Sequence, residues 1–158
     1  MRKYKMAETL GSLCDKLTIV KLKQWHSEDL ERLNSLAEQE KQLQNEINEF
    51  IEAAISGAIP SERLTFSSNK VFRKEGNFVA DINGSIGEVF SQLALVNCSL
   101  WHEQEKVYEF EKVAIEDKDI VVKQLALLNL QRNKCIDCID NQFRIIIESL
   151  NQAIPIRT

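Results

Sequence analysis

Residues that form turns are scarce in this chain, and this scarcity limits the possible folds more than any other feature. The 158 residues include only five glycines and two prolines, against averages of about 7% and 5%. From residue 7 to residue 56 there is no proline, and Gly11 is the only glycine. Because a β-sandwich or barrel needs many turns, the composition favours an all-α fold.

Apolar residues in the first third of the chain recur at steps of three and four, the spacing of one face of a helix. They are Leu10, Leu13, Leu17, Val20, Leu30, Leu33, Leu36, Leu43, Ile47, Ile51 and Ile55. One straight helix over residues 8–55 would be about 72 Å long, whereas a domain of this size is about 40 Å across. We therefore expect the helix to break or to protrude, and the weak helix formers Asn34 and Ser35 predict the place of a break.

The rest of the sequence predicts a long connection and two further helices. Glycine, proline, serine and asparagine gather in residues 57–84, where residues 74–77 suggest a short hairpin. Ser85 and Glu88 form a capping-box pattern at the start of the third helix. Residues 116–119 are expected to make a turn and to start the fourth helix. The prediction is a single helical domain over residues 1–158, a bundle of about four helices.

An internal repeat emerges when each residue is aligned with the residue 76 positions later. The chain has two tryptophans and two histidines, and they form the pairs Trp25–His26 and Trp101–His102. The same alignment pairs Leu10 with Ile86, Gly11 with Gly87, Leu13 with Val89, Leu17 with Leu93 and Val20 with Val96. The pattern predicts a duplicated helical hairpin, with repeat 1 over about residues 7–56 and repeat 2 over about residues 85–150.

Each Trp-His pair is followed by an acidic residue three positions after the histidine, Asp29 in one repeat and Glu105 in the other. This spacing puts His26 with Asp29, and His102 with Glu105, on one helix face. We expect buried tryptophans at helix crossings and histidines that face a polar strip. Such a strip would bind a ligand or a metal. Alternatively, the His-acid pairs are structural, and this interpretation is favoured because di-iron bundles use the opposite order, Glu-x-x-His.

Two more groups of residues are candidates for binding. Arg132 and Asn133 belong to a polar strip on the last helix, which also contains Asp137 and Asp140. An arginine there would bind a sugar, phosphate or carboxylate group, or the strip would be a solvated face. The central connection has a basic edge, Arg63, Lys70, Arg73 and Lys74, which is either an anion or partner contact or a solvated loop.

The four cysteines permit one metal hypothesis. Cys98, His102, Cys135 and Cys138 could hold zinc across two helices, because 98 and 102 share a helix face, as do 135 and 138. Cysteine is also a common small buried residue, and a C-x-x-C in mid-helix lacks the helix N-terminus that activates a redox thiol. Four cysteines are too few for a disulfide scaffold, so we expect reduced thiols.

Charge and hydropathy exclude several classes of function. The net charge of −4 indicates no nucleic-acid partner. We find no secretory signal and no apolar run long enough for a membrane span, so we expect a cytoplasmic protein. No catalytic triad and no phosphate-binding glycine loop is present, and the sequence implies no cofactor.

Three segments resemble an uncharacterised bacterial family, domain of unknown function 4254. They are Leu-Trp-His-Glu-Gln-Glu at 100–105, Leu-Asn-Leu-Gln-Arg-Asn at 128–133 and Ile-Asp at 139–140. The segment at 8–23, which begins Glu-Thr-Leu-Gly, resembles a further block of that family, which there follows the others and here precedes them. The resemblance implies a helical fold and an association with bacterial surface-polysaccharide genes, but no reaction.

These observations lead to two hypotheses about function. The first is a homodimeric helical adaptor or binding protein that works beside enzymes of surface-glycan synthesis. The second is an enzyme whose Trp-His-x-x-acid strips form a metal or sugar-phosphate site. They differ in whether His26, Asp29, His102 and Glu105 converge on a shared cavity or lie on the surface.

Overall fold

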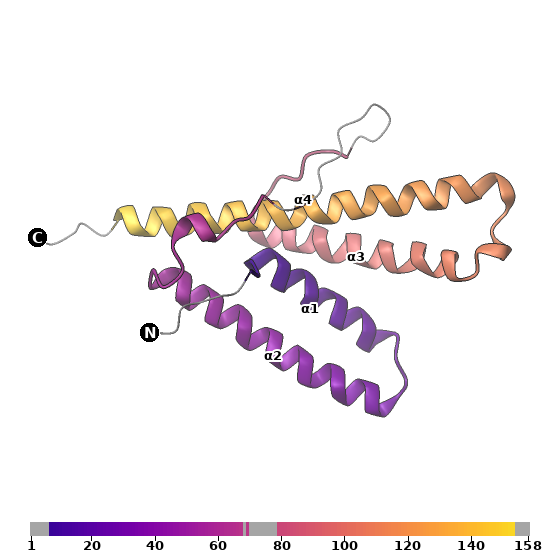
Figure 1. Cartoon of the computed structure of the whole chain (residues 1–158), viewed down its shortest axis with the longest axis horizontal. Coiled ribbons are helices and arrows are strands. Elements are labelled where there is room, and N and C mark those ends of the chain that lie inside the picture. Colours follow the sequence, from indigo (N-terminus) through magenta and orange to yellow (C-terminus); the bar gives the residue numbers. More distant parts are fainter. Residues whose placement is uncertain (1–6, 68, 70–78, 154–158) are drawn as a thin grey trace, which may run out of the picture.

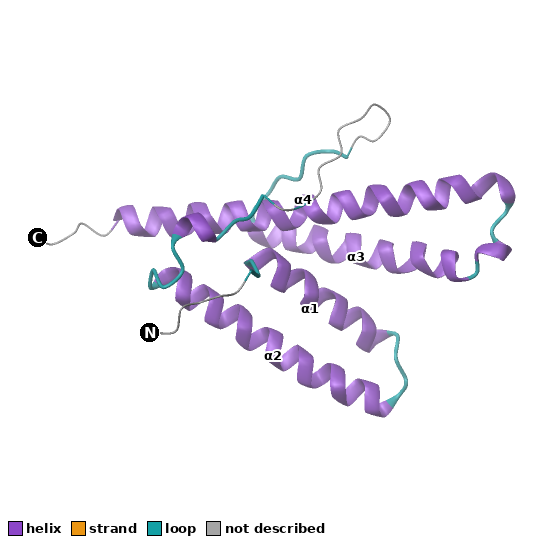
Figure 2. Cartoon of the chain, viewed as in Figure 1, coloured by secondary structure: helices purple, strands orange, loops and turns teal. Residues whose placement is uncertain are grey.

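The computed structural model of the chain describes residues 7–67, 69 and 79–153. The hairpin expected at residues 74–77 and the basic residues 70, 73 and 74 lie outside them. Helices make up 80% of the described residues, which contain no strand, so the all-α prediction is confirmed (Figure 2). The helices are α1 (Leu10–Trp25), α2 (Leu30–Ile55), α3 (Ile86–Tyr108) and α4 (Ile115–Ala153), with short 3₁₀ turns at Ser61–Arg63 and Phe110–Lys112.

The four helices form two hairpins that pack through α1. In Figure 1, α1 lies between α2 on one side and α3 with α4 on the other, and it contacts all three. Both hairpin turns lie towards the right of the view, so α1 and α3 run in the same general direction. Many of the core side chains belong to the expected apolar faces, although Leu30 and Ile55 are exposed. The largest fully buried side chains include those of Leu13, Val20, Val89, Leu93, Ile139 and Ile147.

The break in the first half of the chain is not where the sequence predicted it. Asn34 and Ser35 lie inside α2, and the chain turns at residues 26–29 instead. Asp29 ends the turn because its carboxylate accepts a hydrogen bond from the backbone N–H of Arg32 at 2.7 Å and so caps α2. At the start of α3, the Ser85–Glu88 capping box is present as predicted.

The closest contact between the two hairpins is at Gly11. A Cβ at this position would lie 2.6 Å from the carbonyl oxygen of Ile136 and 2.9 Å from a carboxylate oxygen of Asp140. The backbone N–H of Gly11 donates a 2.7 Å hydrogen bond to that carboxylate. Glycine is therefore required here for close approach of α1 to the backbone of α4.

Residues at equivalent positions of the two repeats have similar burial on one helix face and different burial on the other. Leu13 and its counterpart Val89 are buried, as are Val20 and its counterpart Val96. On the other face, Gly11 is buried and Gly87 exposed, because only α1 packs against the partner hairpin at this position. The shared face supports the duplication, which remains a prediction.

Candidate functional site

The two Trp-His motifs meet at the surface. The ring of His26, just past the end of α1, stacks on Trp101 of α3 with centroids 4.6 Å apart and planes 18° from parallel. His102 approaches the same imidazole edge-on, at 6.3 Å. The Nδ1 atom of His26 lies 2.8 Å from the carbonyl oxygen of Leu22, so this nitrogen carries the proton and donates. We call His26, Trp101 and His102 the aromatic cluster.

The expectation that both tryptophans are buried is wrong. Trp25 is 86% exposed, whereas Trp101 is half-buried under the imidazole of His26. The cause is the position of the turn: α1 ends at Trp25, before the helix reaches a neighbour that could cover the indole. Leu30, at the start of α2, is 77% exposed. Trp25 and Leu30 together with the aromatic cluster form what we call the tip surface.

The two acidic residues of the motif do not join the histidines in a cavity. His26, Asp29, His102 and Glu105 are all exposed. The carboxylate of Asp29 is already engaged in capping α2. These four residues therefore lie on the open surface, and the position of Asp29 is explained by helix capping.

Arg132 and Asn133 lie half-buried on α4. The Nε atom of Arg132 is buried and has no hydrogen-bond partner among the described residues. The hydrogen bonds and ion pairs of the described residues do not connect Arg132 or Asn133 to His102 or Glu105. A common binding site of Arg132 and Asn133 with the histidines therefore stays a prediction.

The cysteines are free thiols, of which Cys135 is buried and the other three are partly buried. No three His, Cys, Asp or Glu side chains in the described part of the chain are placed to hold a metal ion, so Cys98, His102, Cys135 and Cys138 do not form the zinc site considered from the sequence. All four cysteines are free. Burial raises the pKa of both Cys14 and Cys135 to about 11, which keeps these thiols protonated and unreactive.

A buried polar bridge, which the sequence did not reveal, fixes α1 against α3. The side-chain amide of Asn97 donates to a carboxylate oxygen of Asp15 at 2.8 Å and to the hydroxyl of Thr18 at 2.7 Å. Asp15 and Asn97 are both buried. Since a buried carboxylate without a partner is costly, this bridge specifies how the two hairpins pack.

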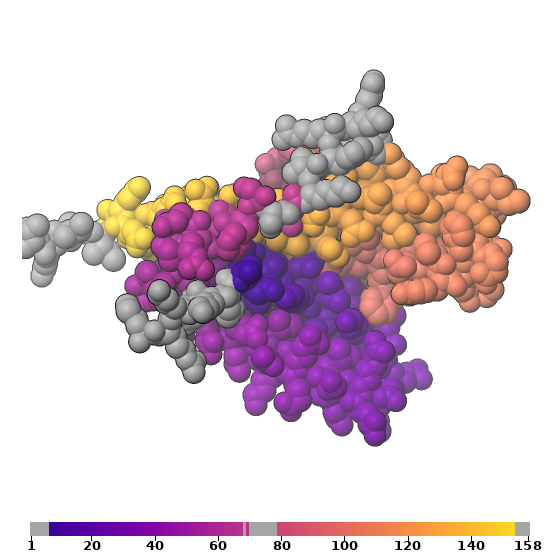
Figure 3. All heavy atoms as spheres, viewed as in Figure 1, coloured from indigo at the N-terminus to yellow at the C-terminus, as the bar shows by residue number. Residues whose placement is uncertain are grey.

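A second candidate site lies where the segment after the 3₁₀ turn at 61–63 crosses α4. It is a cavity of about 220 Å³, which we call the polar pocket; its lining residues are Thr65, Phe66, Ser67, Asn69, Asp137, Asp140 and Asn141. In Figure 3 the segment in magenta lies against α4 in yellow and orange. The side-chain amide of Asn69 donates a 2.6 Å hydrogen bond to Asp137 and ties the segment to the helix.

The two carboxyl groups of the polar pocket have perturbed acidity. Asp140 is only 3% exposed, and burial raises its pKa to about 6, although hydrogen bonds from the Gly11 N–H and the Thr9 side chain act in the opposite direction. Burial also raises the pKa of Asp137, against the effect of its hydrogen bond from Asn69. A cavity that contains carboxyl groups with perturbed pKa values is a recognised indicator of a binding site.

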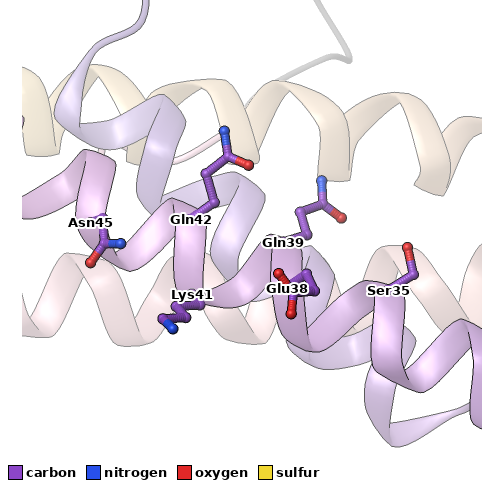
Figure 4. A pocket seen from close by; sticks show the side chains of 6 residues that line it. All are labelled: Ser35, Glu38, Gln39, Lys41, Gln42 and Asn45. Carbon is purple, nitrogen blue, oxygen red and sulfur yellow. The ribbon is translucent and has the colours of Figure 1, made fainter.

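A larger hollow, of about 440 Å³, lies on α2. Figure 4 shows that the side chains lining it, those of Ser35, Glu38, Gln39, Lys41, Gln42 and Asn45, all come from this one helix. All six residues are exposed. The hollow is thus a depression in the solvated face of α2, with no second element to enclose a ligand.

Comparison with known proteins adds no function. No family model matches this chain, and neither the curated proteins nor the solved structures yield a match. Among the described residues, no helix has the length and apolar character needed to cross a membrane.

Proposed function

We propose that this chain is a helical adaptor or binding protein that contacts a partner protein through the tip surface. The observation that carries the proposal is the exposure of Trp25, the neighbour in sequence of His26, whose ring stacks on Trp101. Tryptophan and other large apolar residues dominate the energetics of protein interfaces, whereas an indole that meets only water gains nothing from its apolar area.

The enzyme alternative receives less support. A catalytic site needs groups held in a water-excluded cavity, and all four of His26, Asp29, His102 and Glu105 are exposed. An exposed, rigid aromatic surface suits recognition, because the stack with Trp101 and the hydrogen bond to Leu22 already fix the imidazole of His26. The resemblance described above adds the expectation that the partner belongs to bacterial surface-glycan synthesis in the cytoplasm.

Photo-cross-linking tests the proposal. A photoreactive phenylalanine analogue replaces Leu30 in the full chain, and a control protein carries it at Glu49, an exposed position on α2. We expect a product of defined mass from position 30 and none from position 49. A product with twice the mass of the chain would identify a second copy as the partner.

Competition makes the test specific for Trp25. Excess unlabelled wild-type chain should suppress the product, whereas a Trp25→Ser competitor should be at least tenfold weaker. Equal competition by the two chains, or equal products from positions 30 and 49, would overturn the proposal.

A further inference from the structure

The polar pocket contains two carboxyl groups, and one of them, that of Asp140, is almost completely shielded from water. Among the described residues that line it, Asp137 and Asp140 are the only ones with ionisable side chains, and both are acidic. The ion pairs formed among the described residues do not involve either one. A buried carboxylate without a cationic partner is unfavourable, and a bound cation offsets this cost.

The remaining lining groups define the shape of a suitable ligand. Thr65, Ser67, Asn69 and Asn141 provide hydroxyl and amide oxygens that accept hydrogen bonds, and Phe66 provides an apolar surface. A volume of about 220 Å³ accommodates a small organic molecule and is larger than a metal ion requires. Because the lining residues that the structure describes include two carboxylates and no lysine, arginine or histidine, a cationic ligand suits them better than an anionic one.

We propose that the polar pocket binds a small organic ammonium ion, whose N–H groups donate to the carboxylates of Asp137 and Asp140. An ammonium group has three donors and no acceptor, which matches two carboxylates flanked by hydroxyl and amide oxygens. A neutral polyol would satisfy the hydrogen bonds but leave both negative charges uncompensated. The site is separate from the tip surface, so it does not depend on the proposed adaptor function.

The hydrogen bond from Gly11 to Asp140 links the pocket to the contact between the hairpins. A cation at Asp140 draws electron density from the same carboxylate that accepts the N–H of Gly11 at 2.7 Å. Binding should therefore change the chemical shift of the Gly11 amide. Gly87 provides an internal comparison, because it is exposed and no atom lies within 4 Å of the position of its Cβ.

Calorimetric titration of the full chain with ethanolamine, at constant ionic strength, tests the proposal. Ethylene glycol is the matched neutral probe, since a hydroxyl replaces the ammonium group. We expect saturable binding of ethanolamine, at least tenfold tighter than that of ethylene glycol. In protein labelled with ¹⁵N-glycine, ethanolamine should shift the Gly11 amide and leave that of Gly87 unchanged.

Three variants locate the binding. Asp137→Asn and Asp140→Asn should each weaken ethanolamine binding at least tenfold, and Asn at 140 retains an oxygen that accepts the N–H of Gly11. Glu49→Gln, which removes one exposed charge from α2, should change the affinity less than twofold. Should the variant at 140 fail to fold, the variant at 137 decides the outcome.

Any one of the following results with the organic probes would overturn the proposal. They are the absence of saturable binding of ethanolamine, equal affinity for ethanolamine and ethylene glycol, and equal binding by Asp137→Asn and Glu49→Gln. Calcium chloride, titrated alone, is the comparison for a metal: tighter binding of calcium than of ethanolamine, lost in Asp137→Asn, would assign the pocket to a metal ion and reject the ammonium site.

Discussion

Gly11 and Gly87 occupy equivalent positions in the two halves of the chain, yet their surroundings are opposite. Gly11→Ala places a methyl group 2.6 Å from a backbone oxygen of α4, so we expect it to lower the free energy of unfolding by about 1–3 kcal/mol. Gly87→Ala meets open space inside a helix and should raise it by about 0.5–1 kcal/mol. Urea denaturation measures both, and equal effects would contradict the close contact at Gly11.

The two tryptophans also differ in what they contribute. Trp25→Ala should change the free energy of unfolding by less than about 0.5 kcal/mol, as expected for an exposed residue. Trp101→Ala removes the stack on His26, worth about 0.5–1.5 kcal/mol, together with the half-buried indole surface. Chemical denaturation of the two variants should therefore rank Trp101→Ala as the more destabilising. The reverse order would show that Trp25 is covered in solution.

The carboxyl group of Asp140 predicts a specific pH dependence. Its pKa is about 6 in the folded chain, above the ordinary value of 3.8, so the folded state binds the proton more tightly than the unfolded state. This group therefore lowers stability as the pH rises from about 4 to 6, with a total effect of about 3 kcal/mol for two pKa units. The nearby charge of Asp137 on α4 also raises the pKa of this carboxyl group, whereas the Cys14 thiol on α1 is neutral in this pH range.

Asp140→Asn isolates that effect from the titration of other groups. The amide resembles the neutral carboxyl group and keeps an acceptor for Gly11, so the variant should be more stable than the wild type at pH 7. The difference should shrink as the pH falls and disappear near pH 4. Urea denaturation at a series of pH values measures it, and a difference that is constant with pH would argue against a raised pKa.

At the scale of helices, caps account for one correct and one incorrect prediction. Ser85 with Glu88 announces a helix start by local chemistry alone, and α3 begins there. Asp29 does the same for α2, but its position three residues after His26 led to its interpretation as a ligand residue. Asp29 fits both the pattern of a helix cap and that of a His-x-x-acid ligand pair. Because the first turn lies at residues 26–29, Asp29 acts as a cap.

Substitutions of Asp29 separate these two roles. Asp29→Ala should lower the free energy of unfolding by about 1 kcal/mol, and Asp29→Ser, which keeps a capping oxygen, should restore most of this loss. Thermal or urea denaturation provides the measurement. If Ser and Ala are equally destabilising, the contribution of Asp29 is not that of a cap.

The polar pocket could not be predicted from the sequence, although every lining residue is printed there. Asn69 and Asp137, which share a hydrogen bond, are 68 positions apart and belong to no common motif. Periodicity identifies which face of α4 is buried, but it cannot tell which distant segment crosses that face. The Asp15–Asn97 bridge was missed for the same reason.

At the scale of the whole molecule, the described part of the chain exposes many large apolar side chains. Ile145, Ile146 and Leu150, near the C-terminal end of α4, are all exposed. Such surfaces usually mark an interface. We therefore expect the homodimer suggested from the sequence to bury more than about 1,000 Å² in total, which stays a prediction.

Sedimentation equilibrium at tens of micromolar protein tests this prediction. The wild type should have the mass of a dimer, and the double variant Ile146→Glu, Leu150→Glu should have that of a monomer. Trp25→Ser should remain dimeric, which distinguishes this association from contacts at the tip surface. A monomeric wild type would contradict the prediction.

The hydrogen bond between Gly11 and Asp140 spans 129 positions of sequence and has a consequence for synthesis on the ribosome. At about 5–20 residues per second, Asp140 is added on the order of ten seconds after Gly11. Helices form within microseconds, so the first hairpin exists for a long time before its partner is made. Throughout that interval the face of α1 that contacts α4 is uncovered. The nascent chain is therefore open to chaperones and to wrong pairings until α4 has emerged.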